Sequence, residues 1–155
     1  MLPELEELLA DEKKKILFAG IGNLLKSDDG AGVYISRKIR NSGSITSISV
    51  EVSIENYIGK INGLAPDILI LIDCVEMNSP PGTCNLLPVE KVSDMTFNTH
   101  NISLSRLRDF FEMPVYILGI QPEKVDFGEK ISYIVKKVAD KIIQLINKQE
   151  VHHGY

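Results

Sequence analysis

The apolar residues of the chain form short blocks that predict strands. Two continuous apolar runs, 16–21 and 68–72, are too short for helices and are typical of strands buried on both faces. Segment 115–120 is a third such run, and residues 44–54 alternate apolar and polar side chains, as a half-buried strand does. A Pro-Pro-Gly turn precedes 83–87, where we expect a short edge strand.

Apolar residues at helical spacing occur between these runs. We expect helices at 32–40, 55–64, 102–111 and 129–148, and a short amphipathic helix begins the chain. The last of these helices has an apolar face made of Ile131, Ile134, Val135, Val138, Ile142 and Ile146. Strands that alternate with helices favour an α/β fold with three layers. Its core is an open, twisted, mostly parallel sheet with helices on both faces.

The length of the chain fits one domain. A chain of 155 residues, 44% hydrophobic and 25% charged, can bury a core without disulfide or metal staples. We expect an N-terminal helical extension at 1–14, an α/β domain at 15–150 and a flexible tail at 151–155. The net charge of -4 gives no basic footprint for nucleic acid. No apolar run approaches the roughly 18 residues of a membrane span, so we expect no membrane insertion.

Cysteine usage indicates the compartment. Cys74 and Cys84 are too few for a disulfide framework and have no C-x-x-C spacing. The first residues lack the apolar core of a signal peptide. We therefore expect a cytoplasmic protein with reduced thiols.

Ionisable residues follow the predicted strands, at the sheet edge where α/β proteins place their sites. Asp28 and Asp29 come after the first strand, Asp73 ends the central strand, and His100 precedes the helix at 102–111. Each has a structural alternative. Asp28 or Asp29 can cap a helix, Asp73 can accept loop N–H groups, and His100 can be a hydrogen-bonded loop histidine. One cap needs only one carboxylate, however, and a carboxylate at the end of a buried strand costs free energy unless paired or coordinating.

These residue types together suit a divalent metal. A helix N-terminus disfavours the imidazolium, so His100 should be neutral and able to act as a ligand beside two carboxylates. Three ligands leave positions open for water or substrate, as catalysis requires.

Other site types fit the sequence poorly. The third glycine of a dinucleotide fingerprint would fall at Leu25, and no P-loop motif is present. Cys74 follows Asp73 directly, and because strand side chains alternate it should point away from the site.

The chain resembles the hydrogenase maturation endopeptidases. The segment Gly20–Gly32, GIGNLLKSDDGAG, resembles the opening motif of that family. Three further segments are similar to later family motifs: Ile72-Asp73 with Pro81-Gly82, Thr99–Leu104, and Leu118–Pro122. Order and spacing agree from about Lys15 to Asn147, and the last two motifs are most similar to the type that serves formate-hydrogenlyase hydrogenases.

The resemblance implies an enzyme that clips a C-terminal extension from the precursor of the [NiFe]-hydrogenase large subunit after nickel insertion. By motif position, Asp29, Asp73 and His100 match the catalytic metal ligands of the family. The nickel belongs to the precursor, so no permanent cofactor is expected.

The same motif places four further residues in a loop that faces the substrate: Gly22, Asn23, Asp28 and Gly30. One departure concerns Ser49–Ser53, where family members often carry Asp-Gly-Gly; one wall of the cleft should therefore differ. Two other functions stay open. The three residues could recognise the metallated precursor without cutting it, as a chaperone would, or could hold zinc in an ordinary hydrolase with a small substrate.

Overall fold

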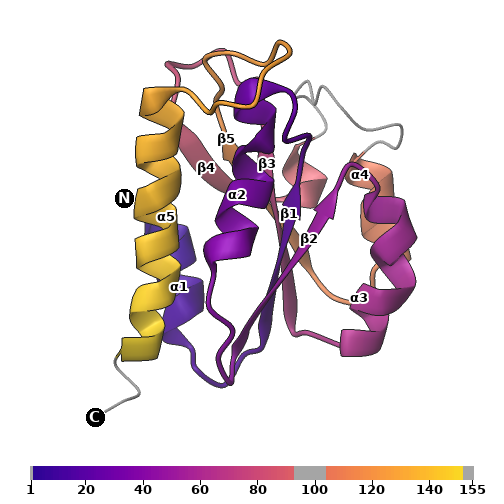
Figure 1. Cartoon of the computed structure of the whole chain (residues 1–155). Coiled ribbons are helices and arrows are strands. Elements are labelled where there is room, and N and C mark those ends of the chain that lie inside the picture. The colour runs from indigo at the N-terminus through magenta and orange to yellow at the C-terminus, as the bar shows by residue number, and fades with distance from the viewer. Residues whose placement is uncertain (1, 93–103, 152–155) are drawn as a thin grey trace.

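A single sheet forms the centre of the protein, which is seen in a computed structural model and described over residues 2–92 and 104–151. Its strands lie in the order β2-β1-β3-β5-β4. They are β1 (Ile16–Ile21), β2 (Ile45–Glu51), β3 (Ile68–Cys74), β4 (Cys84–Pro88) and β5 (Val115–Ile120). Only β4, at one edge, runs antiparallel to its neighbour (Figure 1). The predicted α/β fold with an open, mostly parallel sheet is confirmed.

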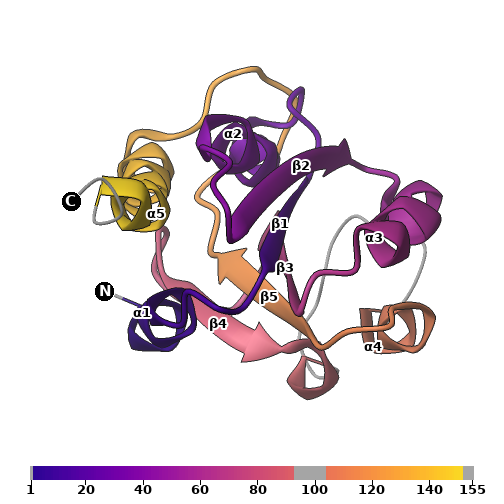
Figure 2. The ribbon, with the colours of Figure 1, turned by 90° about the horizontal axis from the view of Figure 1, so that it is seen from below.

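Helices cover both faces of the sheet. They are α1 (Pro3–Ala10), α2 (Ala31–Lys38), α3 (Ile58–Leu64), α4 (Leu104–Leu107) and α5 (Tyr133–Val151). The helices α1, α2 and α5 pack on one face, and α3 and α4 pack on the other (Figure 2). Four 3-10 turns join these elements: η1 (Ser27–Gly30), η2 (Ile54–Tyr57), η3 (Val89–Lys91) and η4 (Arg108–Phe110). Within the described ranges, no helix is both long and apolar enough to span a membrane.

The buried strands follow their apolar runs closely. The predicted bounds of β1 and β5 are confirmed, and every residue of β1 is buried, as a continuous apolar run predicts. Strand β3 is longer than the run 68–72 and includes Asp73 and Cys74, both buried. Asp73 is therefore a strand residue, paired in register with Gly119 of β5.

Strand β2 is shorter than the alternating pattern 44–54 predicts. It ends at Glu51, whose φ of 55° is left-handed and turns the chain out of the ladder. The pairing register with β1 shifts at the same place, between Gly20 and Ile21. A period-two pattern cannot reveal such a turn, because the side chains beyond it keep alternating.

The last helix begins later than predicted, at Tyr133 in place of 129. Ser132 is held outside the helix because its N–H and hydroxyl groups donate to the carboxylate of Asp28, far away in the sequence. The predicted apolar face is wrong at Ile134, which is 37% exposed, while Ala139 and Ile143 are buried.

Of the helix expected at 102–111, the described part is α4 and η4; the first two residues lie outside the described ranges. The N-terminal helix expected within 1–14 is present as α1. Leu5 and Leu9 of α1 are buried in the same core as α5, so this segment contributes to the domain's own core. Helix α5 includes Val151, and the rest of the expected tail, 152–155, lies outside the described residues.

Candidate functional site

The site predicted from the sequence lies where the order of strand addition reverses, between β1 and β3. From β1, the chain first places β2 on one side and then β3 on the other. Crevices for ligands form in such sheets outside the carboxyl ends of the two strands that flank the reversal. Asp29 lies in η1, directly after β1, and Asp73 lies at the end of β3. The topology thus brings these two carboxylates to one edge of the sheet, where such a crevice is expected.

Gly32 permits α2 to approach the ends of β1 and β3 closely. A Cβ atom on Gly32 would collide with the carbonyl oxygens of Ile21 and Ile72, at the ends of β1 and β3. With glycine there, the first turn of α2 rests on both strand ends. The η1 turn that carries Asp29 is thereby fixed over them.

Asp29 is almost completely buried, and its Oδ2 atom accepts the Asn23 backbone N–H at 2.9 Å. The start of this loop requires glycine at Gly22, which has a φ of 138°. A Cβ atom there would collide with the carbonyl oxygen of Asp29. Gly22 also donates its N–H to Glu51 at the end of β2, at 2.9 Å. The loop is therefore tied to both neighbouring elements.

Substituting Gly22 with Ala should lower the free energy of unfolding by about 2–4 kcal/mol, since a φ of 138° is strained for Ala and its Cβ atom would displace Asp29. Chemical denaturation would measure this loss. Gly43→Ala is the matched control, because a Cβ atom at Gly43 meets no atom within 4 Å. Equal stability of the two variants would contradict the role given to Gly22.

Asp73 is also almost completely buried, and its Oδ1 atom accepts the Cys74 backbone N–H at 2.7 Å. This contact agrees with the alternative in which Asp73 accepts a backbone N–H, and it leaves the metal role untested. Strand alternation puts Asp73 on the face of Leu69 and Leu71, which pack in the core beneath α3 and α4. Leu107 of α4 belongs to that core too.

The carboxylates at this edge of the sheet affect the thiol of Cys74. Burial raises the pKa of the Cys74 thiol far above its usual value, and the charges of Asp73, Asp29, Asp28 and Glu76 raise it further. Four carboxylates therefore act on one point beside the end of β3. A thiol held protonated in this way is a poor nucleophile, which agrees with the expectation that Cys74 does no chemistry.

Iodoacetamide should leave Cys74 unmodified in the native protein at pH 8, since a raised thiol pKa means less thiolate at any given pH. Residue-resolved mass spectrometry of native and urea-unfolded protein measures this protection. We expect modification in urea and less than about a tenth of it in the native state. Rapid native-state labelling of Cys74 would show that its thiolate is accessible.

Asp28 has a structural role that differs from the predicted helix cap. Neither η1 nor α2 has a side-chain cap. Instead, the fully buried Asp28 carboxylate accepts four hydrogen bonds: Glu123 N–H (2.8 Å), Lys124 N–H (2.9 Å), Ser132 N–H (2.6 Å) and Ser132 Oγ–H (2.8 Å). The helix-cap interpretation is wrong, because Asp28 ties its loop to the segment between β5 and α5.

Asp28→Ser should lower the melting temperature by about 5–15 °C, because a serine cannot satisfy four donors and leaves partly buried N–H groups unpaired. A cap would have tolerated the same change. Asp126→Ser is the matched control in the same loop, where the Asp126 side chain is 71% exposed. A melting temperature within about 2 °C of wild type for Asp28→Ser would contradict the role.

Gln121, which received no role in the sequence analysis, organises the loop after β3. Although buried, its Oε1 atom accepts the Met77 N–H at 2.6 Å, and its Nε2 atom donates to Glu76 at 2.9 Å. The sequence could have indicated a role for Gln121, because it is a polar residue directly after the apolar run 115–120. It holds the backbone just beyond Asp73 in place.

Of the remaining predicted site residues, the structure describes Gly22, Asn23 and Gly30 but not His100. Gly22 and Gly30 are buried and Asn23 is partly exposed, so contact with a substrate stays a prediction for this loop. His100, the third predicted ligand, lies outside the described residues. Across 2–92 and 104–151, no three His, Cys, Asp or Glu side chains are arranged to hold a metal ion. The three-ligand set therefore also stays a prediction.

The chain is similar to proteins that mature hydrogenases. Residues 34–149 match the family model described as HycI, hydrogenase maturation protease. The hydrogenase 3 maturation protease of Escherichia coli is 28% identical over 141 residues, which cover 87% of this chain and 90% of that protein. A curated protein of Methanocaldococcus jannaschii is 28% identical over 159 residues, with 92% and 94% coverage.

Solved structures agree with the fold. The [NiFe] hydrogenase maturation protease HycI from Thermococcus kodakarensis superposes with a TM-score of 0.82 at 22% identity, over 94% of this chain and 97% of that one. The solution structure of the endopeptidase HycI from Escherichia coli gives a TM-score of 0.76 at 27% identity, with 88% and 91% coverage.

Proposed function

This chain belongs to the hydrogenase maturation protease family and is therefore a hydrolase, and from that premise we propose its reaction. It is an endopeptidase that removes the C-terminal extension from the precursor of a [NiFe]-hydrogenase large subunit. Cleavage depends on nickel already inserted in that precursor. The motifs at Thr99–Leu104 and Leu118–Pro122 resemble the type that serves formate-hydrogenlyase hydrogenases, and this resemblance supports such a hydrogenase as the partner.

One observation supports the proposal: Asp29 follows β1 and Asp73 ends β3, and these two strands are neighbours in the sheet. Their charges, with those of Asp28 and Glu76, act together on the neighbouring thiol of Cys74. A group of carboxylates of this kind attracts a cation and repels a carboxylate or phosphate. It thus suits a partner that presents a bound divalent metal.

In this proposal Asp29, Asp73 and His100 are the ligands that the enzyme offers to nickel held by the thiolates of the precursor. Nickel stands high in the divalent affinity order, so oxygen and nitrogen ligands of modest strength can distinguish its presence. A metal so placed can polarise the scissile carbonyl or lower the pKa of an attacking water. The nickel is part of the substrate, and the enzyme needs no metal of its own.

We place the reaction in the cytoplasm. Both cysteines are free thiols, as expected in a reducing compartment.

Intact-mass spectrometry tests the proposal. Purified enzyme is mixed with a nickel-loaded large-subunit precursor, and the precursor should lose the mass of one C-terminal peptide. Tight binding without any mass loss would favour the chaperone alternative.

Metal analysis separates the remaining alternative. An ordinary zinc hydrolase would purify with about one tightly held zinc per chain and would need no nickel in its substrate. We expect much less than one metal ion per chain in the purified enzyme.

A further inference from the structure

Exposed apolar side chains gather near the loop that carries Asp29. The described part of the chain has eight exposed large hydrophobic residues. Four of them lie within 125–134, and a fifth is Leu25. Phe127 is 83% exposed, and Leu25 and Val125 are exposed as well. We call these three residues the apolar rim. Exposed apolar clusters on an otherwise charged surface mark sites where proteins bind.

Hydrogen bonds fix the backbone that carries the rim. The Ser27 N–H donates to the Gly128 carbonyl at 2.7 Å, and the Gly128 N–H donates to the Leu25 carbonyl at 2.8 Å. The Ser27 hydroxyl donates to the carbonyl of Asp126, also at 2.8 Å. These contacts place the backbone of Leu25 beside that of Phe127. A surface fixed before binding loses little conformational entropy when a partner docks.

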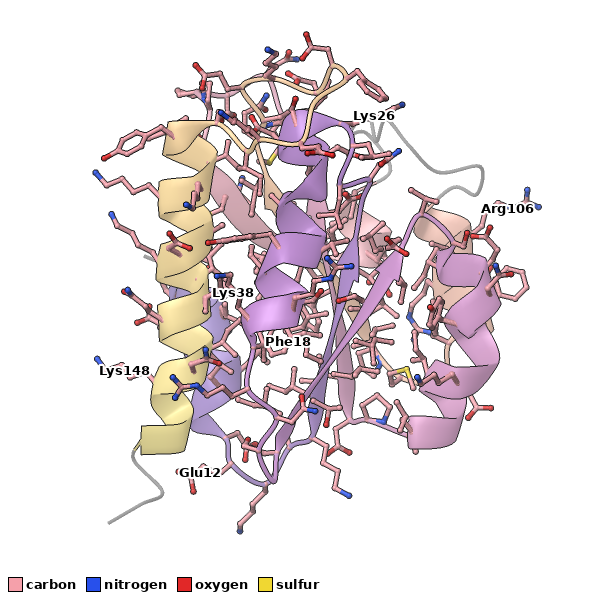
Figure 3. All side chains as sticks on the ribbon, in the orientation of Figure 1. Glu12, Phe18, Lys26, Lys38, Arg106 and Lys148 are labelled. Carbon is pink, nitrogen blue, oxygen red and sulfur yellow. The ribbon has the colours of Figure 1, made fainter. Side chains whose placement is uncertain are left out.

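The rim lies at the functional edge of the sheet. Leu25 is four residues before Asp29 in one loop, and the Asp28 carboxylate ties that loop to the segment of Val125 and Phe127. Lys26, in the same loop, lies at the end of the molecule opposite Glu12 (Figure 3). The rim therefore lies beside the loop that carries Asp29.

We propose that the apolar rim is the docking surface for the protein substrate, engaging an apolar face of the precursor outside the segment that is cleaved. This inference rests on the proposed function. Lys26 is exposed, and the Lys124 side chain is 62% exposed and pairs loosely with Asp126 at 3.9 Å. Glu123 and Glu129 are exposed in the same segment, so both charge signs flank the rim and the complementary face is chiefly apolar. Docking there holds the metal site of the precursor close to the loop that carries Asp29.

The test compares two exposed phenylalanines. Phe127→Ser removes the centre of the rim, and Phe110→Ser is the matched control, because Phe110 is 53% exposed on η4, across the sheet among the α3 and α4 elements. Steady-state cleavage of the nickel-loaded precursor gives kcat and KM, and biolayer interferometry gives the Kd. We expect Phe127→Ser to raise KM and Kd at least tenfold with kcat unchanged, and Phe110→Ser to match wild type. Leu25→Ser is the second rim variant, used if Phe127→Ser lowers the melting temperature.

The outcomes separate this inference from the proposed function. If wild type cleaves and both rim variants keep its KM and Kd, the docking inference is wrong and the function stands. If wild type binds the precursor without cleaving it, the function is wrong, and a tenfold weaker Kd in the rim variants still supports docking. If light scattering shows a wild-type dimer that Phe127→Ser dissociates, the occupant is a second copy and the inference is overturned.

Discussion

Asp73→Asn should reduce cleavage of a nickel-loaded precursor by at least about a thousandfold while the protein stays folded. Asn keeps the shape of Asp and can still accept the Cys74 N–H that Asp73 accepts at 2.7 Å. It lacks the negative charge that a metal ligand supplies, and a lost interaction at the reacting centre costs several kcal/mol of transition-state stabilisation. Single-turnover cleavage and thermal unfolding measure the two effects separately.

The matched control is Asp67→Asn, next to the opposite end of the same strand. The Asp67 carboxylate is exposed and accepts the Lys15 N–H at 2.8 Å. Its variant should cleave within about threefold of wild type. Cleavage by Asp73→Asn at a comparable rate would show that Asp73 only supports the loop.

Substitution of the adjacent acids Asp28 and Asp29 should affect different properties, stability for Asp28 and cleavage for Asp29. Asp29→Asn should lose cleavage at least about a hundredfold with a small change in melting temperature, since Asn at this position can still accept the Asn23 N–H. Asp28→Asn should lose mainly stability. The Asp28 carboxylate accepts four hydrogen bonds, and in Asn one of its two oxygens becomes an NH2 group, which cannot accept them. Both variants are measured in one pair of assays, unfolding and cleavage at 25 °C. Equal losses of cleavage at matched stability would remove the distinction between ligand and loop organiser.

The sheet could be predicted because apolar pattern and burial coincide in it. The run 16–21 became β1 without change, since both faces of that strand are covered. The pattern failed where backbone conformation decides: the left-handed Glu51 ends β2, although apolar residues keep alternating to 54. It also failed at the start of α5, because the partner of Ser132 is Asp28, more than a hundred residues away.

The candidate site followed from topology more than from local pattern. Placing acids after two strands suffices to bring Asp29 and Asp73 to one edge, once the strand order puts β1 beside β3. The same reasoning could have selected Gln121, which follows β5. It could not distinguish Asp28 from Asp29, because the difference lies in contacts with 123–132 that no local sequence rule encodes.

The most direct measurement compares one precursor in two metal states. Nickel-loaded and nickel-free forms of the same large-subunit precursor are given to one enzyme preparation, and the rate of mass loss is followed. If Asp29, Asp73 and His100 engage nickel that the precursor carries, the loaded form is cut at least about a hundredfold faster, and nickel added to the enzyme alone changes nothing. Efficient cleavage of the nickel-free form would contradict the account.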